Sequence, residues 1–374
     1  MALDPPTRDW LLGLVAGAPP PAERVDWPTA LPALRTHRLE GAALTLGGDL
    51  PSPVRAVLEA PAHRAALATT LAVEGGERAL VELGRAGIPA LLFKGAALVR
   101  VGLYPHPASR PMDDADVLVP DGAGEAAFRV LERVGFRPWS AWVAGRAAWL
   151  DSATLFSPTS TPLLPTSVDL HWRLRYAGLR FGEHRGAALW ERADLSAGLP
   201  AAERHLVVIA EHVVKHARVR PHLLAFGDLT RLAARVSDWD DVVRTARDGG
   251  VGRGVGWVLG AARTELSACV PEGVIRELTA GRPGPRALHP TAILDPERRL
   301  PGRAAGLGLR WRILGSPRAV AADLVDIAFP GLGWLRGRYG SGPHALLWGR
   351  YALHALGWLV GVARSPASPN QELL

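Results

Sequence analysis

Three short segments in the first half of the chain carry the hydrophobic pattern of β-strands. Residues 88–93 form an apolar run that ends at Lys94-Gly95, which is typical of a strand buried on both faces. Residues 167–172 alternate polar and apolar side chains, which predicts a strand with one polar and one buried face. Residues 114–119 begin with Asp-Ala-Asp and end in an apolar run, which predicts a second strand. The pattern therefore predicts a sheet in which these strands are neighbours.

Helical spacing of apolar residues dominates on both sides of these strands. Residues 64–85 have a helical pattern that Gly75-Gly76 is expected to break in two, and Gly122 to Gly135 is expected to be a helix that returns to the sheet. We expect an α+β fold, with a mixed β-sheet core flanked by helices and with N-terminal and C-terminal helical regions. The expected regions are a helical lead-in that packs on the sheet (1–85), a sheet-bearing core (86–200), a helical domain (201–280), a Pro/Arg-rich linker (281–303) and a basic, aromatic helical tail (304–374).

Composition narrows the class of protein. Cys269 is the single cysteine, which excludes an internal disulfide and a cysteine-based metal site and favours the cytoplasm. The net charge of +7 is concentrated in residues 301–374, which hold eight arginines but three acidic residues. Nucleic acid is one partner that such a tail could bind, but a solvated basic face is the favoured interpretation. Only Lys94 and Lys215 among the 43 basic residues are lysine, so Lys94 is expected to serve where a compact ammonium group is needed.

Acidic side chains mark the polar faces of two predicted strands. Because strand side chains alternate between faces, Asp114 and Asp116 are expected on one face, and Asp169 and His171 on one face of strand 167–172. Pairing of the two strands would bring the three carboxylates together, and carboxylates this close repel each other unless a cation lies between them. A glycine turn at Gly95, which could hold a phosphate, completes a pattern suited to metal-assisted phosphoryl or nucleotidyl transfer.

The order of these motifs resembles a known family. Lys-Gly, then Arg-x-x-x-Asp-x-Asp, then an apolar-Asp-apolar-His-Trp segment is similar to the nucleotidyltransferase-like family of the DNA polymerase beta superfamily, over roughly residues 80 to 240. The resemblance implies that Gly95 is the turn glycine, that Asp114 and Asp116 are metal ligands, and that Asp169 is the third carboxylate, which binds metal and readies the acceptor. Ala96 departs from the Gly or Ser that often follows the turn glycine, so phosphate binding falls to Lys94 and backbone amides.

The implied activity is a nucleotidyltransferase that depends on Mg²⁺, with Mn²⁺ as a substitute, and that moves an NMP group from an NTP onto a hydroxyl or phosphate. ATP is the favoured nucleotide, and a small molecule or peptide is the favoured acceptor. The expected nucleotide-binding residues are Lys94, Gly95, Ala96 and Arg110, although Arg110 could equally form a salt bridge with an aspartate. The alternative is a catalytically silent fold of this type that binds a nucleotide, a peptide or a partner protein.

Residues outside these motifs are candidates for supporting roles. His171 is expected to orient Asp169 or to pack in the sheet. His212 and His216 share one face of a predicted helix, where ordinary packing is favoured over a zinc site. By resemblance, the segment around them closes over the site, so the candidates to contact the metal ligands or the substrate are His212, Lys215, His216 and Asp228.

The apolar stretch between Pro343 and Arg364 permits two interpretations. Arg350 is its only charged residue, and Gly357-x-x-x-Gly361 lies within it, which would suit a membrane helix. His344, Arg350 and the helix-weakening Gly349 oppose that assignment, so a buried or partner-facing helix is the favoured interpretation.

Overall fold

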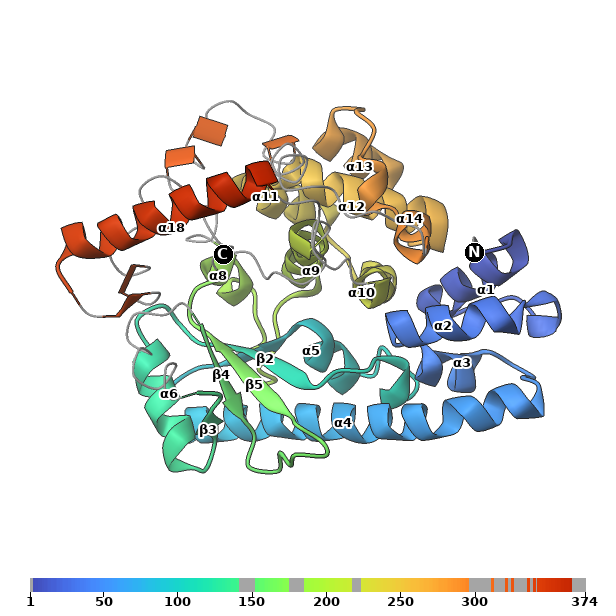
Figure 1. The fold of residues 1–374 in the computed structure, drawn as a ribbon, viewed down its shortest axis with the longest axis horizontal. Helices are drawn as coiled ribbons and strands as arrows, with labels where there is room; N and C mark the ends of the chain where they lie inside the picture. Colours follow the sequence, from blue (N-terminus) through green and yellow to red (C-terminus); the bar gives the residue numbers. More distant parts are fainter. Residues whose placement is uncertain are drawn as a thin grey trace.

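The computed structural model describes residues 3–140, 152–174, 185–216 and 223–295, together with residues 342–364 and short pieces between 311 and 340. These residues form an α+β fold whose sheet has the strand order β1-β2-β5-β4-β3 (Figure 1). Strand β2 is parallel to β5, and the other neighbouring pairs are antiparallel. The strands are β1 (Leu91–Phe93), β2 (Asp114–Leu118), β3 (Arg137–Pro138), β4 (Ser152–Phe156) and β5 (Ser167–His171).

Helices make up most of the described chain. The named ones are α1 (Pro5–Ala16), α2 (Trp27–His37), α3 (Glu40–Leu46), α4 (Ser52–Arg85), α5 (Lys94–Arg100), α6 (Gly124–Arg133), α8 (Arg185–Trp190), α9 (Ala202–His216), α10 (Leu223–Ala233), α11 (Trp239–Asp248), α12 (Gly252–Leu266), α13 (Glu272–Thr279), α14 (Pro290–Leu294) and α18 (His344–Arg364). Short 3₁₀ turns lie at Ala22–Arg24, Pro107–Ser109 and Arg286–Leu288.

The expected break at Gly75-Gly76 is wrong, because α4 is one continuous helix of 34 residues that also runs through Pro61. The two glycines are buried where the helix lies against the sheet. A Cβ at Gly76 would lie 2.8 Å from Leu92 Cδ1 and 2.9 Å from Ala115 Cβ. The glycines therefore allow the close approach of helix and sheet, and tertiary packing outweighs their weak helix propensity.

The two faces of the sheet pack against different helices and carry different side chains, as the period of two along a strand predicts. Apolar side chains of β2, β4 and β5 pack against α4 and α6 on one face, in the buried cluster that contains Ala115, Val117, Val168, Leu170 and Phe128. On the opposite face, β1 and the end of β2 pack against α8 and α9 through a smaller cluster. The acidic residues of β2 and β5 lie on this second face.

A larger helical core lies beside the sheet. The N-terminal helices α1 to α3 pack in this core with α9, α10 and α12. Within residues 1–85, the helix that packs against the sheet is therefore α4. Figure 1 shows α4 running below the sheet and α9 to α14 gathered on the other side of it. The division into five regions stays a prediction. Within the expected linker, α14 and the preceding 3₁₀ turn form, and Leu288, Ile293 and Leu294 are buried.

Much of the predicted basic tail lies outside the described residues. Its longest described element is α18, where Leu353 and Leu356 are exposed and Leu347 and Tyr351 are buried. Among the described helices, none combines the length and the hydropathy that crossing a membrane requires.

Candidate active site

Strand register brings the predicted carboxylates together. In the parallel pair of β2 and β5, Asp116 lies directly opposite Asp169, and Asp114 lies opposite Ser167. The three aspartates therefore lie on one face of two adjacent strands, although 55 positions separate the first from the last. The predicted pairing of these strands is confirmed, and the face that it creates is the one turned away from α4 and α6.

Asp116 is the most heavily contacted of the three. Its Oδ1 atom lies 2.5 Å from Lys94 Nζ and 3.0 Å from His171 Nε2. Ligand atoms of Asp116, Asp169 and His171 all lie within 4.8 Å of one another, which makes this a group that could hold a metal ion. Asp114 is not part of this group. His171, expected to orient Asp169 or to pack, contacts Asp116 instead.

Asp169 has a partner that the sequence did not point to. Thr154 on β4 lies directly opposite Asp169, and its hydroxyl donates to Asp169 Oδ1 at 2.7 Å. This bond fixes the orientation of the carboxylate and involves Oδ1 but not Oδ2. Thr154 could have been found only from the pairing of β4 with β5, because threonine is ordinary in a strand.

The pKa values of the Asp116 and Asp114 carboxyl groups are shifted in opposite directions. Burial alone would raise the pKa of Asp116, but the Lys94 ammonium and the His171 ring outweigh burial and hold this pKa well below its usual range. Desolvation by the surrounding protein is the main effect that raises the pKa of Asp114 to about 6, and repulsion from the negative charges of Asp116 and Asp169 adds to it. The Asp114 side chain nonetheless reaches solvent, so a bound ligand could contact it. A bound cation would relieve the repulsion among the three carboxylates.

Lys94 directly follows β1 as the first residue of α5, and its backbone is left-handed with a φ of 52°. Its backbone N–H donates to Nε2 of His205 on α9 at 2.7 Å. Burial lowers the pKa of His205 to about 4, so the ring is neutral at pH 7. The sequence does not single out His205, because helical spacing pairs His212 with His216 further along the same helix.

Gly95 and Ala96 follow in the first turn of α5, and both are buried. A Cβ at Gly95 would lie 2.8 Å from an Arg110 guanidinium nitrogen, so only glycine allows Arg110 to come this close. The Ala96 methyl group packs in the sheet-side core and offers no hydroxyl to a ligand. The predicted roles of both residues in nucleotide binding stay predictions.

Arg110 forms a salt bridge with an aspartate, which is the alternative to triphosphate binding that the sequence allows. Its Nε and Nη2 atoms donate to the two carboxylate oxygens of Asp228 on α10, at 2.7 and 2.8 Å. Tyr104 also donates to Asp228, at 2.5 Å. Burial lowers the pKa of Arg110, but Asp228 outweighs burial and the net shift is upward. Asp228 therefore contacts the site through Arg110.

The remaining candidates lie on α9. His212 is half-buried there. Lys215 and His216 belong to the same helix, but their side chains lie outside the described residues. Supporting roles for these three residues stay predictions.

A family model described as an uncharacterised nucleotidyltransferase matches residues 23–266, which is more than half of the chain. The match includes every candidate site residue named above. Searches of curated proteins and of solved structures find no match. The predicted resemblance is thus confirmed at the level of the family, and the chain belongs to these uncharacterised nucleotidyltransferases.

Proposed function

We propose that this site transfers an NMP group from an NTP to a hydroxyl or phosphate acceptor with the help of a divalent cation. The observation that carries the proposal is the pairing of Asp116 with Asp169 on adjacent parallel strands, next to the Lys94-Gly95 turn. Membership of a nucleotidyltransferase family supports the same reaction class. Carboxylates grouped beside a phosphate-binding turn are what metal-assisted phosphoryl chemistry needs.

The residues present fit a hard divalent cation. Carboxylate oxygens are the ligands that Mg²⁺ prefers, and Asp116 and Asp169 provide them within one group, with Asp114 close enough to feel their charge. The imidazole of His171 would also suit Mn²⁺. Asp114, Asp116 and Asp169 would hold the ion. When bound, it would neutralise the developing charge on the phosphate oxygens.

The chain's own side chains would divide the remaining work. Asp169, oriented by Thr154, would take the proton of the acceptor hydroxyl as its oxygen bonds to the α-phosphorus and pyrophosphate leaves. Lys94 would offer its ammonium to phosphate oxygens, as a point charge suited to that task. Arg110 would act mainly by shaping the turn, since its guanidinium is already bound to Asp228.

The partners of the reaction remain part of the proposal. ATP is the nucleotide to test first, and a small molecule or a peptide is the proposed acceptor. A nucleic acid that binds the basic tail would instead show strongly salt-dependent affinity. Fold alone does not select among these acceptors.

A second candidate, a catalytically silent module that binds a nucleotide, a peptide or a partner protein, has two observations in its favour. Lys94 Nζ lies 2.5 Å from Asp116 Oδ1, so a side chain of the chain itself can neutralise this carboxylate. The methyl group of Ala96 also offers no hydrogen-bond donor to a phosphate. Binding without transfer is the result that this candidate predicts.

The deciding experiment compares wild type with Asp116→Asn. Thermal unfolding is measured with ATP, CTP, GTP or UTP, each with and without Mg²⁺, and α-³²P-labelled NTPs are then incubated with a cell extract. The enzyme predicts stabilisation that requires both the metal and Asp116, and label on an acceptor in wild type only. Stabilisation without labelled product would select the silent module. No response to any nucleotide would contradict the enzyme and favour a module that binds a peptide or a partner protein.

A further inference from the structure

The backbone of Lys94 is held in a conformation that a lysine rarely adopts. Its φ of 52° lies in the left-handed region, where a side chain with a Cβ is disfavoured. Non-glycine residues persist there only where the surrounding structure holds them, and such positions cluster at functional sites. The same residue places its ammonium on Asp116. The contacts that hold this turn therefore matter for the site.

His205 supplies the most direct of these contacts. The N–H of Lys94 donates to His205 Nε2 at 2.7 Å, and the ring is buried, with 3 % of the residue exposed. A nitrogen that accepts a hydrogen bond carries no proton, so the neutral ring has its proton on Nδ1. Protonation of Nε2 would place two donors face to face and break the contact.

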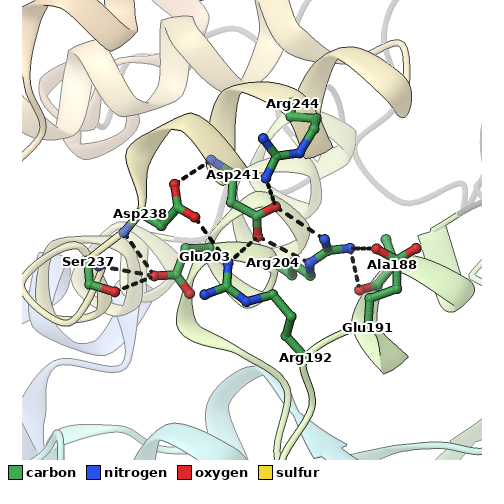
Figure 2. Close-up of polar contacts among 9 residues, drawn as sticks. All are labelled: Ala188, Glu191, Arg192, Glu203, Arg204, Ser237, Asp238, Asp241 and Arg244. Carbon is green, nitrogen blue, oxygen red and sulfur yellow. Dashed lines mark hydrogen bonds and ion pairs between the residues drawn. The ribbon is translucent and has the colours of Figure 1, made fainter.

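The start of α9 that carries His205 is itself anchored, as Figure 2 shows. Arg204, the preceding residue, donates to both carboxylate oxygens of the fully buried Asp241 on α11 and to the carbonyl oxygen of Ala188 on α8. Glu203 accepts from the backbone N–H groups of Ser237 and Asp238, just before α11. Three successive buried titratable residues thus fix this turn of the helix against its neighbours.

A second contact reaches the turn from α10. Asp228 holds the Arg110 guanidinium, which lies against Gly95 where a Cβ would be only 2.8 Å away. The turn is therefore held from two sides by helices that come more than 100 positions later in the chain.

We propose that His205 is a positioning residue: it fixes the Lys94-Gly95 turn from α9, so that the Lys94 ammonium is held at Asp116. The benefit to phosphate binding rests on the proposed function, but the positioning of Lys94 does not. His205 contacts the backbone and not a reacting group. Helices α9 and α10 then act as a template for the phosphate turn, in addition to covering the site.

The chain is well suited to a direct test, because Lys94 and Lys215 are its only lysines. Trace acetylation followed by mass spectrometry gives the ratio of modification at Lys94 to that at Lys215, with no need for activity. His205→Gln keeps an acceptor at this position, whereas His205→Leu keeps bulk and removes the acceptor. We expect the ratio to rise about fivefold in the Leu variant, the factor that one net hydrogen bond is worth, and to stay near wild type in the Gln variant. An unchanged ratio in a folded Leu variant would overturn the proposal.

A measurement on wild type covers the case in which His205→Leu does not fold. Long-range ¹H–¹⁵N NMR with labelled histidine should show the His205 ring at pH 7 with its proton on Nδ1 and a bare Nε2. A protonated Nε2 would overturn the proposal. If wild type binds Mg-ATP, the Leu variant should bind it more weakly and the Gln variant should not. If wild type binds no nucleotide, the proposed function fails, while the acetylation ratio still decides the role of His205.

Discussion

Asp116 receives two cationic or polar partners on a single carboxylate oxygen. Lys94 Nζ and His171 Nε2 both contact Oδ1, at 2.5 and 3.0 Å. These contacts outweigh the effect of burial, so the carboxyl group stays ionised over the whole working pH range of a protein. Asp114, two positions earlier, has a pKa of about 6. A difference of this kind between neighbouring carboxyl groups is typical of functional sites.

Removal of one charge tests the importance of Asp116. Loss of a residue that only supports a metal ligand costs roughly 10- to 100-fold in metal affinity or activity. Asp116→Asn removes a proposed ligand itself, so it should lower metal-dependent nucleotide binding and transfer by more than this. Asp121→Asn is the matched control, since Asp121 is exposed and pairs with Arg173 past the end of β2. Equilibrium binding of Mg-ATP and label transfer are the measurements. Equal behaviour of the two variants would contradict the assignment.

His205 makes a prediction about stability and pH. Burial lowers its pKa to about 4, opposed by Asp228 and Asp116 and aided by Lys94, whereas the ordinary value is 6.5. Between pH 6.5 and 4 the unfolded chain therefore binds more protons at this residue than the folded chain. The free energy of unfolding should thus fall as pH falls through this window, by roughly 2–3 kcal/mol from this residue.

Comparison of wild type with His205→Gln isolates this contribution, because all other groups, Asp114 included, titrate in both proteins. Urea unfolding at several pH values between 4 and 7 gives the difference. The wild-type protein should lose stability relative to the Gln variant as the medium is acidified. A difference that does not change with pH would mean that His205 titrates normally.

At the scale of elements, α4 and the sheet illustrate how packing overrides local propensity. Two adjacent glycines predict a weak point, yet the helix continues because their lack of side chains lets it approach β1 and β2. Burial of the apolar residues of α4 against the sheet supplies the stabilisation that propensity does not.

Two alanine substitutions on this one helix should have opposite effects. Gly76→Ala places a methyl group 2.9 Å from Ala115 Cβ and should destabilise the protein by about 1–2 kcal/mol, since overpacking outweighs the better helix propensity. Gly84→Ala meets nothing within 4 Å and should stabilise by roughly 0.5–1 kcal/mol. Urea denaturation measures both. Stabilisation by both substitutions would show that α4 can move away from the sheet.

At the scale of the whole molecule, the buried Arg110–Asp228 pair joins the sheet to the helical core. The two side chains are 14 % and 2 % exposed, and they connect the segment before β2 to α10. A pair this buried is costly to break from one side, because the remaining charge has no equal partner. Tyr104 shares Asp228 and would not replace the lost charge.

Asp228→Ala should therefore destabilise the protein by about 3–5 kcal/mol, and the double variant Arg110→Met with Asp228→Leu should be less destabilised than the single one. The exposed pair of Arg129 and Glu132 provides the control, because Glu132→Ala should change stability by less than about 1 kcal/mol. Chemical denaturation gives all three values. Equal losses in the single and double variants would show that the pair is not the link.

The sequence predicts the fold class and the strand faces that carry the three aspartates because these signals are local. The period of two in strands that begin near Asp114 and Ser167 assigns Asp114, Asp116 and Asp169 to strand faces, and this period holds along the whole length of a strand. The order of short motifs also identified the family. The same local logic predicts a break at the glycine pair in α4, where the helix is in fact continuous.

The sequence by itself determined which residues share a face, because the period of a strand is fixed by backbone geometry. Only the tertiary structure decided which residues distant in the sequence are in contact: Thr154 with Asp169, Arg110 with Asp228, and Lys94 with a histidine 111 positions later. Such partners depend on how whole helices and strands pack together, and packing is the sum of many weak contacts that no short segment encodes.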